Sequence, residues 1–211
     1  MVQLLELKDL EYDGLAALEA LISKSPYGSL LQAVASLTLF THPETVRILG
    51  PRNIFPTIRN AARRGEFIDT PTGKVMLDDN KSPTDAFMWA NGWKRRPRDL
   101  QFNHIYQASS EVEHYTNLRN ICVSPSFLAK LTDTHLEVRA ALKYRVFQLY
   151  EYKINSSLPK NFGWYERLKW ATPLPFRASA CQDILAEVEK RKKDRTCVAS
   201  RRLGLGLDYP F

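Results

Sequence analysis

Residues 99–131 read DLQFNHIYQASSEVEHYTNLRNICVSPSFLAKL, and this stretch decides the fold that we expect for the chain. Its first residues predict a β-strand, in which side chains alternate between two faces. The two faces carry Leu100, Phe102 and His104 on one side, and Asn103 and Ile105 on the other. A polar segment then predicts a loop, structure restarts at Asn117-Leu118, and residues 126–131 predict a short helix.

The order of residues in this stretch resembles the motif of the HNH nuclease family. In that family a strand ends in an acidic or amide residue followed by His, a loop leads to Asn-Leu, and an apolar-Cys pair precedes a helix. The matching residues are Asn103-His104-Ile105, Asn117-Leu118 and Ile121-Cys122, with Ser126 where the family has a third polar residue. The resemblance covers about thirty of the 211 residues and implies a ββα-metal core within residues 93–153.

The resemblance implies a site for phosphodiester hydrolysis. His104 would be the general base that takes a proton from the attacking water, because a neutral imidazole titrates near the working pH. A buried strand histidine is the alternative. Asn117 would hold the His104 ring by a hydrogen bond. One divalent cation, Mg²⁺ or alternatively Mn²⁺, would bind the scissile phosphate.

The metal ligands implied by the resemblance depart from the family pattern. Asn103 and Ser126 are neutral, so they are weaker ligands than the Asp and His of the family. Either the metal site is degenerate or a ligand comes from elsewhere. His135 completes the predicted metal set as the nearest imidazole beyond the loop, while Asp133 and His114 are further candidates. An exposed or capping side chain is the alternative for each of these histidines.

Basic residues lie close to this stretch. The chain has 30 Lys and Arg against 23 Asp and Glu, a formal charge of +7. The excess favours a polyanionic partner, with solubility charge as the alternative. We expect the basic run before the strand, which an aromatic residue heads, and one basic residue in the following helix to bind nucleic acid. These residues are Trp93, Lys94, Arg95, Arg96, Arg98 and Lys130.

The region 1–92 predicts short helices and one β-hairpin. Capping and breaking residues place the helices over 12–23, after Ser29, after a cap at Thr41, from Pro56 to Gly65, and over 86–91. Residues 66–77 predict the hairpin, with its turn at 70–73. Helices followed by a hairpin resemble a winged helix-turn-helix, with a helical cap that has a solvated basic face as the alternative. The helix before the wing would carry the nucleic-acid-binding residues Arg59, Arg63 and Arg64.

The region from 133 onward predicts two more helices. The first begins at Asp133-Thr134 and runs to about residue 153. An irregular segment rich in aromatic residues follows over 155–178, within the region 154–211. The second helix begins near Ser179 and ends in a charged run at 189–195, before a basic tail.

Composition and patterning exclude several classes of protein. Three cysteines without a CxxC pair exclude a disulfide scaffold and a standard zinc knuckle, and are typical of a reducing cytosol. No apolar run approaches the ~18–20 residues of a membrane span, and the first residues lack a signal-peptide pattern. We therefore expect a soluble, cytoplasmic α+β protein that is mostly helical, with a β-hairpin and an HNH-like ββα core.

Three hypotheses for function follow. The first is a metal-dependent DNA endonuclease of HNH type, suited to restriction, phage defence or mobile-element DNA. Its partner would be double-stranded DNA, and a palindromic target would call for a homodimer. The second is a non-catalytic DNA-binding protein with a winged-helix-like region and a degenerate HNH-like motif. The third is a basic interaction protein with no nucleic-acid role.

Overall fold

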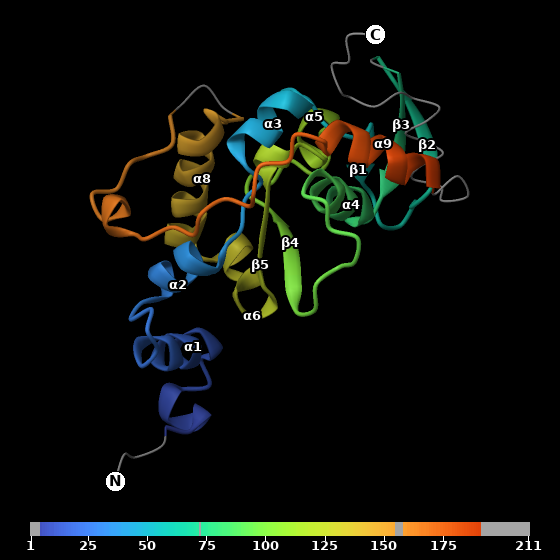
Figure 1. Cartoon of the computed structure of the whole chain (residues 1–211). Helices are drawn as coiled ribbons and strands as arrows, with labels where there is room; N and C mark the ends of the chain where they lie inside the picture. The colour runs from blue at the N-terminus through green and yellow to red at the C-terminus, as the bar shows by residue number, and fades with distance from the viewer. Residues whose placement is uncertain (1–4, 72, 155–157, 191–211) are drawn as a thin grey trace.

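Two small β-sheets lie among helices in the computed structural model, which describes residues 5–71, 73–154 and 158–190 (Figure 1). The prediction of a mostly helical α+β fold is confirmed, while the HNH-like core stays a prediction. Within these ranges no helix is long and apolar enough to cross a membrane. The predicted tail and most of the charged run before it lie outside the described residues.

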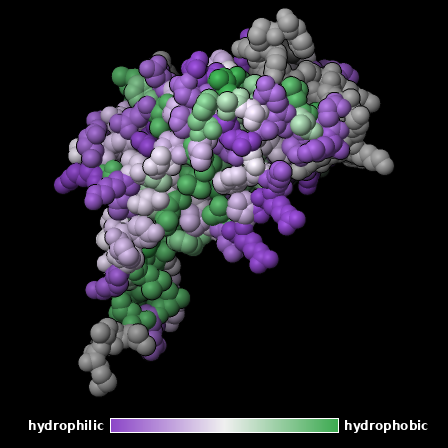
Figure 2. Space-filling model, in the orientation of Figure 1, coloured by the Kyte–Doolittle hydropathy of each residue, from purple (hydrophilic) through white to green (hydrophobic). Residues whose placement is uncertain are grey.

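The helices of the N-terminal region follow the prediction in part, since the first of them, a 3-10 helix, was not predicted and only the cap at Ser29 is confirmed. They are η1 (Leu7–Leu10), α1 (Gly14–Ser23), α2 (Leu30–Leu37) and α3 (Pro43–Leu49). The Ser29 hydroxyl accepts the Gln32 N–H at 3.2 Å, as predicted. His42, not the predicted Thr41, caps α3, because its Nδ1 accepts the Glu44 N–H at 3.1 Å. The segments η1 and α1 extend from the body as an arm, on which hydrophobic side chains gather (Figures 1 and 2).

The helix predicted from Pro56 to Gly65 is wrong. Strand β1 (Thr57–Arg59) occupies this place and pairs in parallel with β3 (Gly73–Asp78). Thr57 and Ile58 are β-branched and favour extended backbone, and the Met76 N–H donates to the Pro56 carbonyl at 3.0 Å. The pairing partner, which the local pattern does not show, therefore decides the conformation of this segment.

The predicted hairpin is confirmed, but its surroundings differ from the predicted wing. Strand β2 (Phe67–Thr70) pairs in antiparallel fashion with β3, so the sheet order is β1-β3-β2. Arg59 ends a strand, and Arg63 and Arg64 lie in the turn between β1 and β2. The prediction that these three arginines share a helix before the wing is therefore wrong.

The predicted strand of residues 99–131 is β4 (Leu100–His104), which pairs antiparallel with β5 (Ile121–Pro125) and places His104 opposite Ile121. The connection between the strands contains α5 (Val112–Tyr115) and η2 (Leu118–Asn120). The helices after β5 are α6 (Ser126–Ala129), α7 (Leu131–Thr134) and α8 (Leu136–Tyr150), followed by η3 (Tyr165–Arg167). Residues 126–131 thus begin a helical segment, as predicted.

The β4–β5 hairpin separates two hydrophobic clusters. Phe102, Ile121 and Val123 belong to the first, together with side chains of α3, α4 (Lys81–Ala90) and α9 (Ala180–Lys190). Cys122 and Ile105 belong to the second, together with side chains of α2 and α8. Because α4 packs against α9, the first cluster draws on all three regions defined from the sequence. Burial on both faces fixes the hairpin and the residue at its end, His104.

Gly92 closes α4 where the chain passes beneath Arg177. Its φ of +70° lies in the left-handed region, and a Cβ there would stand 2.8 Å from the Arg177 Cζ. The Arg177 guanidinium, which is ion-paired to Asp183 of α9, is the far end of a flexible side chain. The left-handed backbone is therefore the main reason for glycine at this position.

Candidate functional site

His104 occupies the last position of β4, and its ring is held by Tyr115. The two rings stack with their centroids 5.3 Å apart and an interplanar angle of 17°. The His104 Nε2 lies 2.8 Å from the backbone carbonyl oxygen of Tyr115. A carbonyl only accepts hydrogen bonds, so Nε2 must carry the proton in the neutral ring. The lone pair then resides on Nδ1, which can act as a base.

The surroundings of His104 favour its neutral form. Burial is the largest effect and lowers the pKa of His104, and the positive charge of Arg59 lowers this pKa further. The bond to the Tyr115 carbonyl and the carboxylate of Asp133 act in the opposite direction. The pKa is lowered on balance, so the imidazole is uncharged near neutral pH.

Tyr115 is itself fixed by the first sheet and α4. Its side chain is fully buried, and its hydroxyl accepts the Asn80 N–H at 2.7 Å. The same hydroxyl donates to Asp78 Oδ2 at 3.5 Å, and this buried carboxylate also accepts the Ser82 N–H at 2.6 Å. Burial is the main cause that raises the pKa of Tyr115, so the hydroxyl keeps its proton. The support under the His104 ring is therefore rigid.

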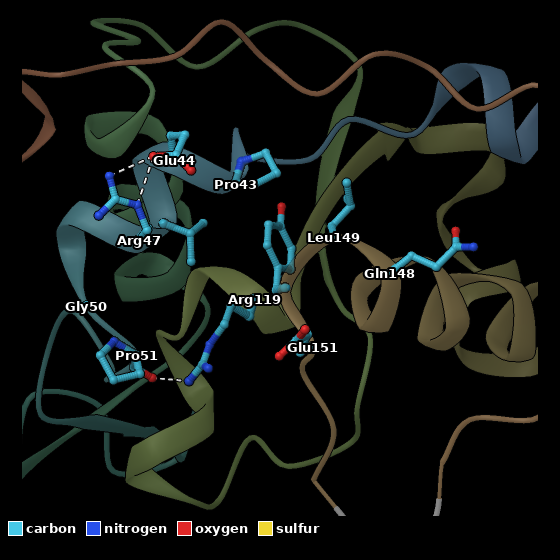
Figure 3. Close-up of a pocket in the computed structure, with 11 residues that line it drawn as sticks. Pro43, Glu44, Arg47, Gly50, Pro51, Arg119, Gln148, Leu149 and Glu151 are labelled. Atoms are coloured by element: carbon cyan, nitrogen blue, oxygen red, sulfur yellow. Dashed lines mark hydrogen bonds and ion pairs between the residues drawn. The ribbon is translucent and has the colours of Figure 1, made fainter.

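Asn117 does not hold the His104 ring, contrary to the prediction. Its amide nitrogen donates to the carbonyls of Pro51 at 3.0 Å and Glu113 at 3.2 Å. Its amide oxygen accepts the backbone N–H and the Nε–H of Arg119 at 3.1 and 3.2 Å. Arg119 in turn points toward the Pro51 carbonyl, as Figure 3 shows. Both residues line a cavity of about 480 Å³ that does not include His104. Asn117 thus stabilises the chain after Tyr115. The Tyr115 carbonyl, and not Asn117, orients the His104 ring.

The three predicted metal ligands do not form a site that suits Mg²⁺. The Asn103 amide donates to Ser124 Oγ at 2.9 Å, and strand alternation turns Asn103 to the face opposite His104. Ser126 is exposed at the start of α6, with its N–H bonded to Asp99. His135 caps α8, because its Nδ1 accepts the Val138 N–H at 3.3 Å. None of the three is a carboxylate, the ligand that Mg²⁺ prefers.

The other candidate ligands have partners as well. His114 bonds to the Tyr152 hydroxyl at 2.8 Å and lies 3.5 Å from Glu111. The capping alternative thus describes His135, while His114 is half-buried and caps none of the described helices. Across the described ranges, no group of three or more His, Cys, Asp and Glu side chains could hold a metal ion. Asp133 is the one carboxylate among the further candidate ligands, and it acts electrostatically on His104.

The predicted nucleic-acid-binding residues divide into two groups. Arg64, Lys94 and Arg96 line one cleft of about 510 Å³ between α4 and β4, which we call the α4–β4 cleft. Lys81 lines the same cleft and was not predicted, since nothing in its local pattern marks it. The predicted residues outside this cleft are Arg59, Arg63, Trp93, Arg95, Arg98 and Lys130.

Three of the residues outside the cleft have clear structural partners. Arg63 is paired to Glu66 at 2.8 Å on the surface. Trp93 packs edge-on against Phe87 of the core, with ring centroids 5.7 Å apart, and its stacking on nucleic acid stays a prediction. The Nε of Arg59 lies 3.6 Å from Asp79 Oδ1.

Comparison with known proteins adds no family to this description, because no protein-family model, no curated protein and no solved structure matches the chain.

Proposed function

We propose that this chain is a nucleic-acid phosphodiesterase that cleaves double-stranded DNA, with His104 as the general base. The observation that carries the proposal is the bond from His104 Nε2–H to the Tyr115 carbonyl, at 2.8 Å. This bond leaves the lone pair on Nδ1, and burial keeps the ring neutral. A base for water needs both properties.

The surroundings of His104 support phosphate as the reacting group. Arg59 is close enough to His104 to lower its pKa, and a guanidinium stabilises the negative charge that develops on a phosphate under attack. The order β4, β5, α6 is the strand, strand and helix order that the HNH resemblance implies, with His104 at the end of the first strand. This order supports the proposal without identifying a metal site.

The proposed step uses residues of this chain alone. His104 Nδ1 takes a proton from a water molecule, and the water oxygen forms a bond to phosphorus. The bond from phosphorus to the leaving oxygen breaks, and that oxygen takes a proton from solvent. The predicted ligands do not fit Mg²⁺, so no step is assigned to a metal, and the Mg²⁺ or Mn²⁺ requirement stays a prediction.

A second candidate function is DNA binding without cleavage. The neutral ligand set of Asn103 and Ser126 favours it, because a degenerate metal site retains the fold and loses the chemistry. The basic α4–β4 cleft serves this function as well as the first.

A cleavage assay with variants of two histidines tests the proposal. Supercoiled plasmid is incubated with the wild-type chain, His104→Ala or His135→Gln, in Mg²⁺, in Mn²⁺ and in EDTA. We expect His104→Ala to lose about 10²–10⁴-fold in rate while DNA affinity is retained, since only the base is removed. His135→Gln, which removes a capping imidazole, keeps the wild-type rate.

The outcomes separate the hypotheses. Cleavage that survives in His104→Ala contradicts the assignment of the base. Tight, salt-sensitive binding without cleavage in any condition supports the second candidate. Binding that is absent at low salt contradicts both and leaves a basic interaction protein.

A further inference from the structure

We infer that the α4–β4 cleft binds a backbone phosphate of the nucleic-acid strand, beside the position that reacts at His104. This inference deepens the proposed function and rests on it. The cleft has a volume of about 510 Å³ and lies between the turn after β1, the start of α4 and the loop that leads into β4.

Positive side chains from three separate segments meet in this cleft. Arg64 comes from the turn after β1, Lys81 from the first residue of α4, and Lys94 and Arg96 from the loop before β4. Two carboxylates, Asp79 and Asp85, also line it, and Asp85 is ion-paired to Lys81. The lining therefore carries more positive than negative charge.

Carboxylates compensate the cations of the cleft to different degrees. The Nε of Arg64 is 3.9 Å from Asp78, which is the outer limit of an ion pair, and Lys94 acts electrostatically on Asp183. Arg96 lies over the Phe102 ring at 5.5 Å from its centroid and makes no ion pair with the residues that the structure describes. The charge of Arg96 is thus available to an anion from solution, with those of Arg64 and Lys94 beside it.

One ion pair links the wall of the cleft to a residue that acts on His104. Asp79, in the wall, faces Arg59 at 3.6 Å, and Arg59 acts electrostatically on His104. Phe102, which also lines the cleft, lies on the same face of β4 as His104 and precedes it by two residues, which is about 7 Å along a strand.

The residues that line the cleft favour recognition of a phosphate group over recognition of a nucleobase. Its one aromatic side chain, Phe102, is 8% exposed and covered by Arg96, so bases have no surface for stacking. Arg and Lys contacts to phosphates position a strand without reading its sequence. We therefore expect the cleft to position many DNA sequences equally.

The test measures duplex affinity against salt for two double variants. Lys94→Gln/Arg96→Gln removes two cations from the cleft, and Arg139→Gln/Lys160→Gln removes two cations that line a separate cavity. The probe is a fluorescent 20-mer duplex in EDTA, followed by anisotropy from 50 to 200 mM salt. We expect the slope of log K against log salt to fall in magnitude by about 0.9 for the cleft variant, because one phosphate contact is lost. We expect little change for the control variant.

Three further arms complete the test. Equal changes in both double variants, or none in the cleft variant, overturn the inference, because the cleft cations would then act only through general charge. Inorganic phosphate and a mononucleotide compete for the cleft; inhibition by either at micromolar concentration, lost only in the cleft variant, identifies a free-nucleotide site and also overturns it. Circular dichroism of both variants checks their folding.

This binding assay is independent of cleavage. A cleft-specific change in slope without cleavage by the wild-type chain supports the cleft and contradicts the nuclease. Cleavage with unchanged slopes contradicts the cleft and supports the nuclease.

Discussion

The two antiparallel strand pairs of the molecule have similar local geometry but different surroundings. In β2–β3, the residues of β2 alternate between exposed and half-buried positions, and Phe67 is 39% exposed. In β4–β5, four of the five residues of β5 are buried, and hydrophobic clusters cover both faces. Strand β3 is buried on both faces as β5 is, so the difference between the two pairs lies in β2, the exposed edge strand. The candidate base belongs to the pair without such an exposed strand.

The largest expected effect is the loss of stability when a phenylalanine of each strand pair is replaced by alanine. Phe102→Ala in β4 should lower the free energy of unfolding by about 3–5 kcal/mol, because a buried ring leaves a cavity. Phe67→Ala in β2 should cost less than about 1 kcal/mol, because the ring is in contact with solvent. Urea unfolding followed by circular dichroism measures both. Equal losses would show that β2–β3 is as well packed as β4–β5.

Substitutions in the connections between the strands should show the same difference. We expect a larger loss of stability in the β4–β5 connection than in the β2–β3 turn. Asn120 is fully buried, accepts the Tyr106 N–H at 2.7 Å and donates to two carbonyls. We expect Asn120→Ala to cost about 2–3 kcal/mol, because it leaves buried groups without partners. Thr70→Ala, in the β2–β3 turn, removes a surface bond to Gly73 and should cost about 1 kcal/mol. A larger loss for Thr70→Ala in urea unfolding would reverse the comparison.

A smaller loss of stability is expected for Tyr115, whose hydroxyl links the β4–β5 connection to the end of β3 and the start of α4. Tyr115→Phe keeps the ring and the carbonyl that hold His104, and removes the hydroxyl that accepts the Asn80 N–H. We expect a loss of about 1 kcal/mol in stability and no loss in DNA cleavage per folded molecule. Loss of cleavage at unchanged stability would mean that the hydroxyl, and not the carbonyl, positions the base.

The smallest expected effect is a dependence of stability on pH that arises from β4–β5. Burial lowers the pKa of His104 in the folded chain below the value of about 6.5 of an exposed imidazole. The unfolded chain then binds more protons than the folded chain once the pH falls below about 6.5, so acid favours unfolding. This contribution to stability is complete above about pH 6.5 and is lost as the pH falls through the folded pKa.

Urea unfolding at pH 7.5 and pH 5.5 measures this dependence. His104→Gln should reduce the difference between the two pH values, while Phe67→Ala, in the other strand pair, should leave it unchanged. A difference that stays the same in His104→Gln would show that other groups cause it.

The sequence predicts β2, β3 and β4 because their signals are local. Alternating side chains and the 70–73 turn place β2 and β3, and the alternation over 100–104 places β4. Strand β1 was missed because its three residues are stabilised by pairing with β3, which is distant in sequence. Short segments of this kind take the conformation of their partner and not that of their own pattern.

The general base of the candidate site could be predicted from the sequence, but the residue that holds it could not. His104 has a side chain that carries chemistry, so a motif can point to it. Tyr115 acts through a backbone carbonyl, which every residue has, and no sequence signal marks that role. The cleft likewise depends on three segments that only the fold brings together, so Lys81 could not be recognised beside Lys94 and Arg96.

The position of β2 at the border of its sheet has a consequence for how the chain behaves at high concentration. No strand of the described residues pairs with the outer side of β2, so its backbone groups there are open to another chain. Phe67 and Ile68 would favour such edge-to-edge association. Charged side chains of both signs flank these residues, because Glu66 is paired with Arg63 at 2.8 Å and Asp69 lies 3.9 Å from Lys74. Charged side chains on an edge strand oppose such association, because pairing with another chain would bring them out of water.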